Sequence, residues 1–134
     1  MATNIFVNLP VIDLDASKAF FEKLGFAFNP QFTDETAAAM VIDSNIFAML
    51  LTHDKFRQFT PKAIADAKTT SEVLIALSRD SRDAVNDLFD KAIAAGATEA
   101  RPGDDYGFMM SKAFSDLDGH IWEIMWMDPA NVQG

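Results

Sequence analysis

The sequence predicts an α+β fold made of two similar halves, each with the order β-α-β-β-β. Each half opens with an apolar, strand-like run that leads into a helix with an apolar stripe. Three further strand-like runs, separated by turn residues, follow each helix. Late in each half, "DSNIFAML" (43–50) and "DGHIWEIM" (118–125) match position for position. Because there are only two copies, the pattern indicates a duplicated unit rather than a repeat array.

The first half, module one, covers about residues 1–53. "NIFVNLPV" (4–11) is apolar with Pro10 near its end, which predicts a strand leading into a turn. A helix follows, with either Asp13 or Asp15 as its N-cap and Gly25 at its end. The remaining strands are expected at about 26–33, 36–42 and 46–52.

Residues 54–70 are more polar, contain Pro61 and read as a connector. We expect a short helix at 62–67 within it. Phe56, Phe59 and Pro61 could form a lid over a cavity. Equally, they could form a contact between modules or subunits.

The second half, module two, covers about residues 71–128. A strand over 71–78 precedes a helix over 81–96, whose apolar face holds Val85, Leu88, Phe89, Ala92 and Ile93. "TEARPGDDYG" (98–107) reads as a short strand and a loop, and two strands, "FMMSKAFSD" and "HIWEIMW", complete the module. We expect residues 1–134 to form a single domain.

Composition excludes several classes of function. The chain has 134 residues, 49% of them apolar, and a net charge of −9, which argues against nucleic acid and anionic membranes as partners. It has no cysteine, so disulfides and thiolate chemistry are excluded. No secretory signal and no apolar run long enough to span a bilayer are visible, so we expect a cytoplasmic protein. Phosphate-loop, zinc-protease and serine-hydrolase motifs are also missing.

The two ends of the chain carry a family resemblance. With "LPVIDLDASKAFFEKLGF" at the front and "DLDGHIWEIMWMDP" at the end, the sequence resembles the vicinal oxygen chelate superfamily. That superfamily contains glyoxalase I, extradiol dioxygenases and the fosfomycin- and bleomycin-resistance proteins. The resemblance covers nearly the whole chain. It implies curved mixed sheets around a cavity, with modules that pair within one chain or across a homodimer.

The resemblance also implies a metal site. Metal-dependent members carry His, Gln or Glu at four inward strand positions, and a divalent ion there chelates two neighbouring substrate oxygens. Carried over to this sequence, the positions are Glu123, Ala48 (or Met49 if the register slips by one), Phe6 and Leu74. Only Glu123 is a metal ligand of the usual kind, and we assign it as a weak one.

Glu123 lies in a strand that is otherwise apolar, so it faces either solvent or a cavity where it has a role. Residues two apart share a strand face, which places Asn8 with Phe6 and Glu72 with Leu74. Asn8, Glu72 and Glu123 could therefore converge, as a weak metal site or as a general base with polar anchors. Alternatively, Glu72 is an exposed residue at a strand start and Asn8 caps a strand end.

Three more residues are expected to line the pocket, namely Leu50, Tyr106 and Met125. Tyr106 follows the Pro/Gly-bounded stretch 101–105 and could donate a hydrogen bond to a ligand, although a plain turn explains it equally. His53 and His120 are expected to be structural or exposed.

Two hypotheses for function follow. The first is a protein that binds a small hydrophobic or aromatic molecule in an apolar pocket and needs no cofactor, with Glu123 and Glu72 as the candidate catalytic carboxylates if it is an enzyme. The second is a metal-dependent lyase or extradiol-type dioxygenase that uses Ni, Zn, Mn or Fe at a displaced site around Glu123.

Overall fold

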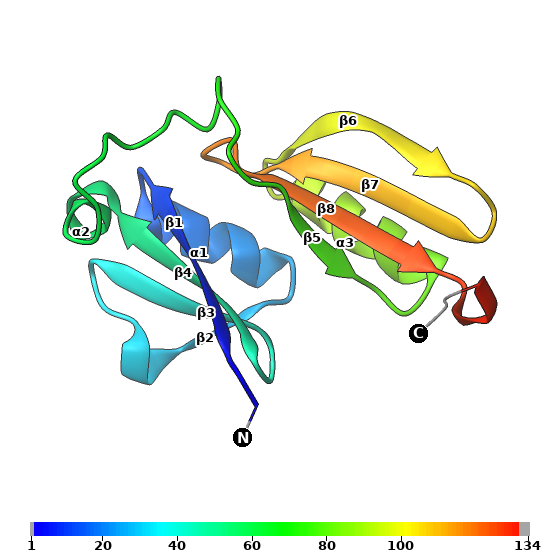
Figure 1. The fold of residues 1–134 in the computed structure, drawn as a ribbon, viewed down its shortest axis with the longest axis horizontal. Helices are drawn as coiled ribbons and strands as arrows, with labels where there is room; N and C mark the ends of the chain where they lie inside the picture. The colour runs from blue at the N-terminus through cyan, green and yellow to red at the C-terminus, as the bar shows by residue number, and fades with distance from the viewer. Residues whose placement is uncertain (1, 132–134) are drawn as a thin grey trace. The chain divides into compact units, whose positions relative to one another are not determined.

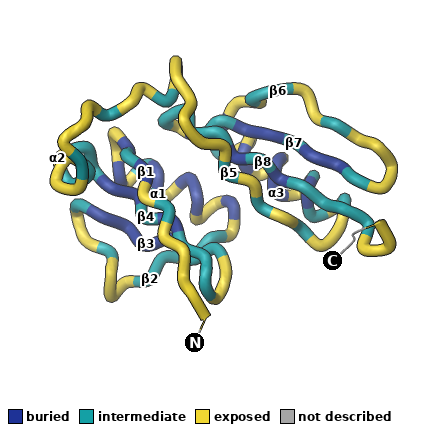
Figure 2. Tube along the Cα trace, viewed as in Figure 1, coloured by how far each residue is buried: buried dark blue, intermediate teal, exposed yellow. Residues whose placement is uncertain are grey.

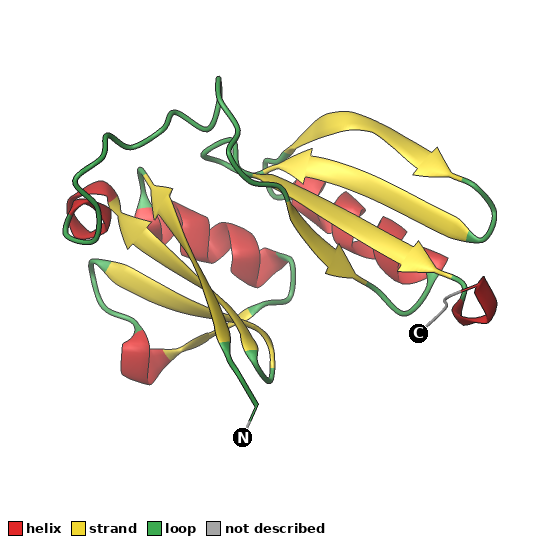
Figure 3. Ribbon diagram, viewed as in Figure 1, coloured by secondary structure: helices red, strands yellow, loops and turns green. Residues whose placement is uncertain are grey.

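The computed structural model describes residues 2–131. The chain forms two compact units, and the boundary between Ala65 and Asp66 falls inside the predicted connector. Each unit contains a four-stranded mixed sheet with a helix on one face (Figure 1). The predicted α+β class and the β-α-β-β-β order of each half are confirmed (Figure 3).

The first unit has the strand order β1-β4-β3-β2, in which β1 and β4 are parallel and the other pairs are antiparallel. Its elements are β1 (Ile5–Val11), α1 (Leu14–Lys23), β2 (Ala27–Asn29), β3 (Ala37–Asp43) and β4 (Ile46–Thr52). Of the two candidate caps, Asp13 caps α1, since its Oδ1 accepts a hydrogen bond from the backbone N–H of Ala16 at 3.0 Å.

The second unit repeats this topology with the order β5-β8-β7-β6. Its elements are β5 (Ile75–Ser78), α3 (Arg82–Ala94), β6 (Thr98–Asp105), β7 (Met109–Ser115) and β8 (Ile121–Met127). Ser81 caps α3, because its Oγ accepts a hydrogen bond from the Ala84 N–H at 3.0 Å. The parallel pair is again formed by the first and last strands of the unit.

Each core lies between the helix and one sheet face, where the most deeply buried side chains gather (Figure 2). In the first unit these residues are Leu9, Val11, Phe20, Phe21, Met40, Ala48 and Leu50, and in the second they are Val85, Leu88, Ala92, Phe114, Trp122 and Ile124. Side chains alternate along a strand, so the residues between them point to the opposite face. We call this opposite side of each sheet its open face.

Two predicted strands are shorter than expected. The run 26–33 breaks after Asn29, whose side chain accepts a hydrogen bond from the Gln31 N–H at 3.0 Å and so starts a 3-10 helix, η1 (Pro30–Phe32). The run 71–78 forms a strand only from Ile75 onward. Glu72 therefore precedes β5 instead of standing in it.

The connector also differs from prediction. Residues 62–67, all of them described, form no helix. A short helix lies earlier instead, α2 (His53–Arg57), because the Thr52 hydroxyl caps it by accepting from the Lys55 N–H at 3.3 Å. A last 3-10 turn, η2 (Pro129–Asn131), follows β8. Every described helix is too short or too polar to cross a lipid bilayer.

Candidate functional site

The open face of the first unit is aromatic and apolar. β1 contributes Phe6 and Asn8 to it, and β4 contributes Phe47 and Met49 in register. The rings of Phe6 and Phe47 stack with centroids 5.0 Å apart and an interplanar angle of 14°. Phe6 is 53% exposed although it is a large hydrophobic residue. Asn8 is exposed, and its Nδ2 donates to the Phe6 carbonyl at 3.4 Å.

The register of β4 decides which residue corresponds to Glu123. Ala48 and Leu50 are both 0% exposed on the helix-covered face, so they are core residues and do not reach the open face. Met49 lies on the open face opposite Ala39, as Glu123 lies opposite Ala113 in the second unit. The turn between β3 and β4 is shorter than the loop between β7 and β8, and β3 has a register shift just before this turn. Because side chains alternate along a strand, a shift of one residue moves a side chain from one face of the sheet to the other.

In the second unit a row of side chains crosses the open face next to Glu123. The row runs through Arg101 on β6, Ala113 on β7, Glu123 on β8 and Ala76 on β5, which are paired in register. Neighbouring strands are about 4.8 Å apart, so Arg101 spans roughly 10 Å to reach Glu123. The small side chain of Ala113, between them, leaves that path clear.

Glu123 is therefore a half-buried carboxylate with a partner. Arg101 Nη2 lies 3.3 Å from Glu123 Oε1, and Arg101 Nη1 lies 3.1 Å from Asp104 Oδ2. The side chains of Arg101 and Glu123 are 37% and 24% exposed. The guanidinium compensates the cost of placing a carboxylate in an apolar strand. It explains why the strand tolerates Glu123.

The donor set around Glu123 does not fit the divalent metal that the resemblance implies. On the same sheet, the neighbour from the parallel strand is Ala76, which has no donor atom. The carboxylates of Glu123 and Asp104 are both engaged by one guanidinium. Within residues 2–131, no group of three or more His, Cys, Asp or Glu side chains could hold a metal ion. We derive no chemical step through a metal.

A cleft of about 470 Å³ lies on the same open face of the second unit. Its sheet-side lining includes Thr98, Ser115 and Ile121, which form the row next to Arg101, Ala113 and Glu123. The segment 67–71 supplies a second part of the lining. The lining thus mixes hydroxyl groups with aliphatic surface, and the Arg101–Glu123 pair lies one row beyond it.

Asp116 holds the loop at one end of the cleft in place. Its Oδ1 accepts hydrogen bonds from the N–H groups of Asp118 and His120, both at 3.0 Å. Its Oδ2 accepts from the indole Nε1 of Trp122, also at 3.0 Å. Burial raises the pKa of Asp116, while the charge of His120 and the hydrogen bonds from Trp122 and Asp118 oppose the rise. Asp116 is thus a structural acid that lines the cleft.

The other predicted site residues are dispersed. Met125 shares the open face of β8 with Glu123, paired with Ser111 and Ser78. Leu74 is 56% exposed just before β5, and Glu72 is exposed two residues earlier. Asn8 belongs to the first unit. Its convergence with Glu72 and Glu123 stays a prediction.

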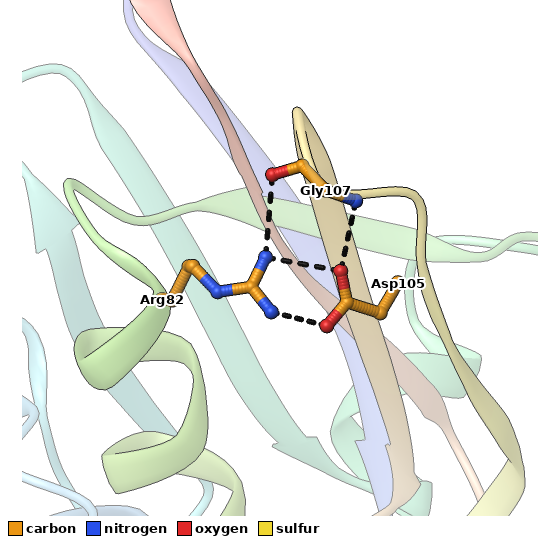
Figure 4. A network of polar contacts seen from close by, with 3 residues as sticks. All are labelled: Arg82, Asp105 and Gly107. Atoms are coloured by element: carbon orange, nitrogen blue, oxygen red, sulfur yellow. Dashed lines mark hydrogen bonds and ion pairs between the residues drawn. The ribbon is translucent and has the colours of Figure 1, made fainter.

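Tyr106 lies at the tip of the β6–β7 hairpin and is 62% exposed. Its ring centroid is 6.5 Å from that of Phe108. Figure 4 shows how this tip is held. Arg82, at the start of α3, forms a two-pronged ion pair with Asp105 and also donates to the Gly107 carbonyl at 3.4 Å, while the Gly107 N–H donates to Asp105 at 3.0 Å.

Replacing Arg82 by alanine should loosen this hairpin tip. The hydrogen bond from Arg82 lowers the pKa of Asp105, so the pair contributes stability above the ordinary carboxyl range and loses it as the pH falls through the lowered pKa. We expect faster amide exchange at Gly107, by less than about tenfold because the pair is exposed. Hydrogen exchange by NMR at neutral pH measures this effect. Arg57→Ala, which breaks an exposed pair on α2, should leave Gly107 unchanged; equal exchange in wild type and Arg82→Ala would contradict the expectation.

The sequence analysis missed Arg101, Asp104 and Asp116. The first two stand in "ARPGDD", which reads as a short strand running into a loop because it contains Pro and Gly. The available signal was a cationic residue, Arg101, three residues before a carboxylate, Asp104, a spacing at which the two can form an ion pair. For Asp116, the signal was an acid preceding the turn at Asp118-Gly119, a position that often accepts hydrogen bonds from turn N–H groups.

Comparisons with known proteins agree with the fold. Residues 3–43 match the family model described as bleomycin resistance protein-like N-terminal. No curated protein matches the chain. The match to the family model lies within the first unit and covers β1, α1, β2 and β3.

Several solved structures share the architecture over nearly the whole chain. A hypothetical protein, SA1046, from S. aureus is 26% identical with a TM-score of 0.78, and the match covers 94% of this chain and 95% of that one. A glyoxalase/bleomycin resistance protein/dioxygenase family enzyme from Burkholderia phytofirmans is 20% identical with a TM-score of 0.76, covering 94% and 99%. The fosfomycin resistance protein FosX from Listeria monocytogenes is 17% identical with a TM-score of 0.67, covering 94% and 93%. These matches confirm the fold that the resemblance of the two terminal motifs implies.

Proposed function

Given that the chain has the fold of the vicinal oxygen chelate superfamily, that of glyoxalase, bleomycin-resistance and dioxygenase proteins, we propose that it binds a small molecule without a resident metal. The observation that carries the proposal is the Arg101–Glu123 ion pair at 3.3 Å. In this pair the guanidinium of Arg101 binds Glu123, the one carboxylate that remains at a ligand position of the family. Fold alone does not assign a chemistry, so the proposal rests on these side chains.

Two surfaces support binding of a hydrophobic or aromatic molecule. In the first unit the stacked rings of Phe6 and Phe47 offer an exposed aromatic platform, and exposed apolar patches often mark binding sites. In the second unit the cleft, whose lining ends one row before Glu123, has a volume within the usual range for ligand pockets. We propose that the ligand uses such apolar surface for affinity and the polar row for orientation.

The alternative is a metal-dependent lyase or dioxygenase with a displaced site. It is supported by the retention of Glu123 at the expected strand position and by the second carboxylate, Asp104, on the same guanidinium. For this reading, Arg101 would have to leave both carboxylates when a metal bound. Ni, Zn, Mn or Fe would be the candidate ions.

Elemental analysis distinguishes the two functions. We expect protein purified without chelator or metal-affinity resin to contain far less than about one metal per chain, for wild type and Glu123→Gln alike, and to take up none on titration, because Arg101 already pairs with both carboxylates. Glu99→Gln, an exposed carboxylate change on the same sheet, is the matched control. Stoichiometric Ni, Zn, Mn or Fe in wild type and in Glu99→Gln, lost only in Glu123→Gln, would overturn the proposal in favour of the metal enzyme.

We also propose a cytoplasmic homodimer. Its support is the exposed apolar surface on the first strand of each unit or next to it, where Ile5, Phe6, Val73 and Leu74 are all more than half exposed. β1 and β5 are both edge strands, and edge strands with apolar side chains favour association.

A further inference from the structure

Arg101 and Glu123 leave a hydrogen-bond donor and an acceptor side by side on the open face. Arg101 Nη1 donates to Asp104 and to the Pro102 carbonyl, both at 3.1 Å, and Nη2 donates to Glu123 Oε1. A guanidinium has five N–H groups. Among residues 2–131, two of these donors and the second oxygen of Glu123 therefore have no protein partner. Both side chains are partly exposed, so a ligand can reach them.

The charges of this cluster select the kind of group that fits. Arg101 carries one positive charge, and Asp104 and Glu123 carry two negative charges, so the cluster has a net charge of −1. The surplus negative charge disfavours a carboxylate or phosphate. An ammonium group would lie beside the positive guanidinium and, having no acceptor atom, would leave the unused Arg101 donors without a partner. An uncharged group avoids both costs.

The neighbours of the pair leave one side of it open. Arg101 crosses Ala113, which is 0% exposed, so that side of Glu123 is covered. On the other side Glu123 pairs in register with Ala76, which is exposed and has only a methyl group as its side chain. The next row, Thr98, Ser115 and Ile121, lines the cleft. A ligand in the cleft can therefore extend a polar group beside Ala76 to the ion pair.

We infer that the ligand carries an uncharged carboxamide-type group, whose oxygen accepts from Arg101 and whose N–H donates to Glu123. A carboxamide places one acceptor beside one donor, which matches the unused groups of this pair. A ligand with only an acceptor or only a donor would leave a half-buried polar group of this pair without a hydrogen bond, and that is costly. The inference rests on the proposed function and names the ligand class of that site.

Four aromatic fragments that differ only in their polar group test this assignment. Benzamide, acetophenone, benzoate and benzylammonium are titrated separately into ¹⁵N-labelled protein, and the amide resonances of β1 and β4 in the first unit and of β7 and β8 in the second are followed. We expect benzamide to bind about fivefold more tightly than acetophenone, the gain of one net hydrogen bond, and more tightly still than the two charged fragments.

Variants then locate the preference. Glu123→Met should abolish the advantage of benzamide over acetophenone while leaving acetophenone binding unchanged, because only the benzamide N–H needs this carboxylate. Arg101→Met should weaken both fragments, because both present a carbonyl oxygen to the guanidinium. Arg101→Met leaves the half-buried Glu123 without its partner, so the double variant Arg101→Met/Glu123→Met is included, because it removes that carboxylate as well and should fold. It too should show no preference for benzamide.

The outcomes separate this inference from the proposed function. If benzamide and acetophenone bind this face equally, or if the preference survives in the double variant, the carboxamide assignment is wrong and the binding function stands. If no fragment perturbs the open face of either unit even at high concentration, both the assignment and the binding function fail.

Discussion

Replacing Gly119 by alanine is expected to destabilise the second unit by about 3 kcal/mol, through backbone strain and a steric clash together. Gly119 has φ +97°, where a side chain is disfavoured. An added Cβ would also lie 2.8 Å from the backbone carbonyl group of Ala67 and from the Lys68 nitrogen. The segment 67–71 lines the cleft, so it would have to move away. Urea unfolding followed by fluorescence of Trp122 and Trp126 measures the loss.

Gly107 offers a matched control for this prediction. Its φ is +83°, but an added Cβ would have no neighbour within 4 Å. Gly107→Ala should therefore show only the cost of the strained backbone, about 1 kcal/mol. The difference between the two variants isolates the contact between the β7–β8 loop and the connector. Equal losses would mean that this contact is not closely packed in solution.

The duplicated pattern made the fold predictable from the sequence. The helix stripes, the caps and the turn residues all lie at equivalent places in the two halves, so each half supports the assignment of the other. The errors fall where a local hydrogen bond competes with the strand pattern. Asn29 and Thr52 each accept from a backbone N–H two or three residues later and so start short helices that hydrophobic periodicity does not reveal.

The candidate site was harder to predict because it depends on which face a residue occupies. Aligning the two halves without a gap placed Ala48 with Glu123, yet the different loop lengths shift the register by one and bring Met49 to the open face. The apolar pattern of β4 is nearly continuous, so alternation gave no warning. For such a strand, only the pairing with neighbouring strands shows which residues face the core and which lie on the open face.

The partner of Glu123 was hidden for a related reason. Arg101 lies on β6, an edge strand that contains Pro102 and two register shifts against β7. Proline and bulges are typical of edge strands, but in a sequence they look like a loop. Glu123 could be recognised as a residue that needs a partner, whereas the identity of that partner follows from tertiary pairing 22 residues away in the chain.

Replacing Asp116 by asparagine is expected to lower the free energy of unfolding by about 2 kcal/mol at neutral pH, because a buried donor loses its acceptor. The asparagine carbonyl oxygen can still accept from the N–H groups of Asp118 and His120. Its NH₂ group then faces the indole N–H of Trp122, a side chain that is only 1% exposed. Both groups are hydrogen-bond donors, so the hydrogen bond to the indole is lost. Urea unfolding of both proteins measures the difference.

The pH dependence of that difference follows from the raised pKa of Asp116. A carboxyl group whose pKa is raised by folding contributes stability that is fully present below its unfolded pKa, about 4, and is lost as the pH rises through the folded pKa. Asparagine lacks this contribution, so the gap between wild type and Asp116→Asn should be larger at about pH 4.5 than at neutral pH. Asp87→Asn, which changes an exposed carboxylate on α3, should follow wild type at both pH values. A gap that shrinks on acidification would mean that the hydrogen bonds to Asp116 outweigh its burial and lower its pKa, and the loop at the end of the cleft would then be held by a charged acid.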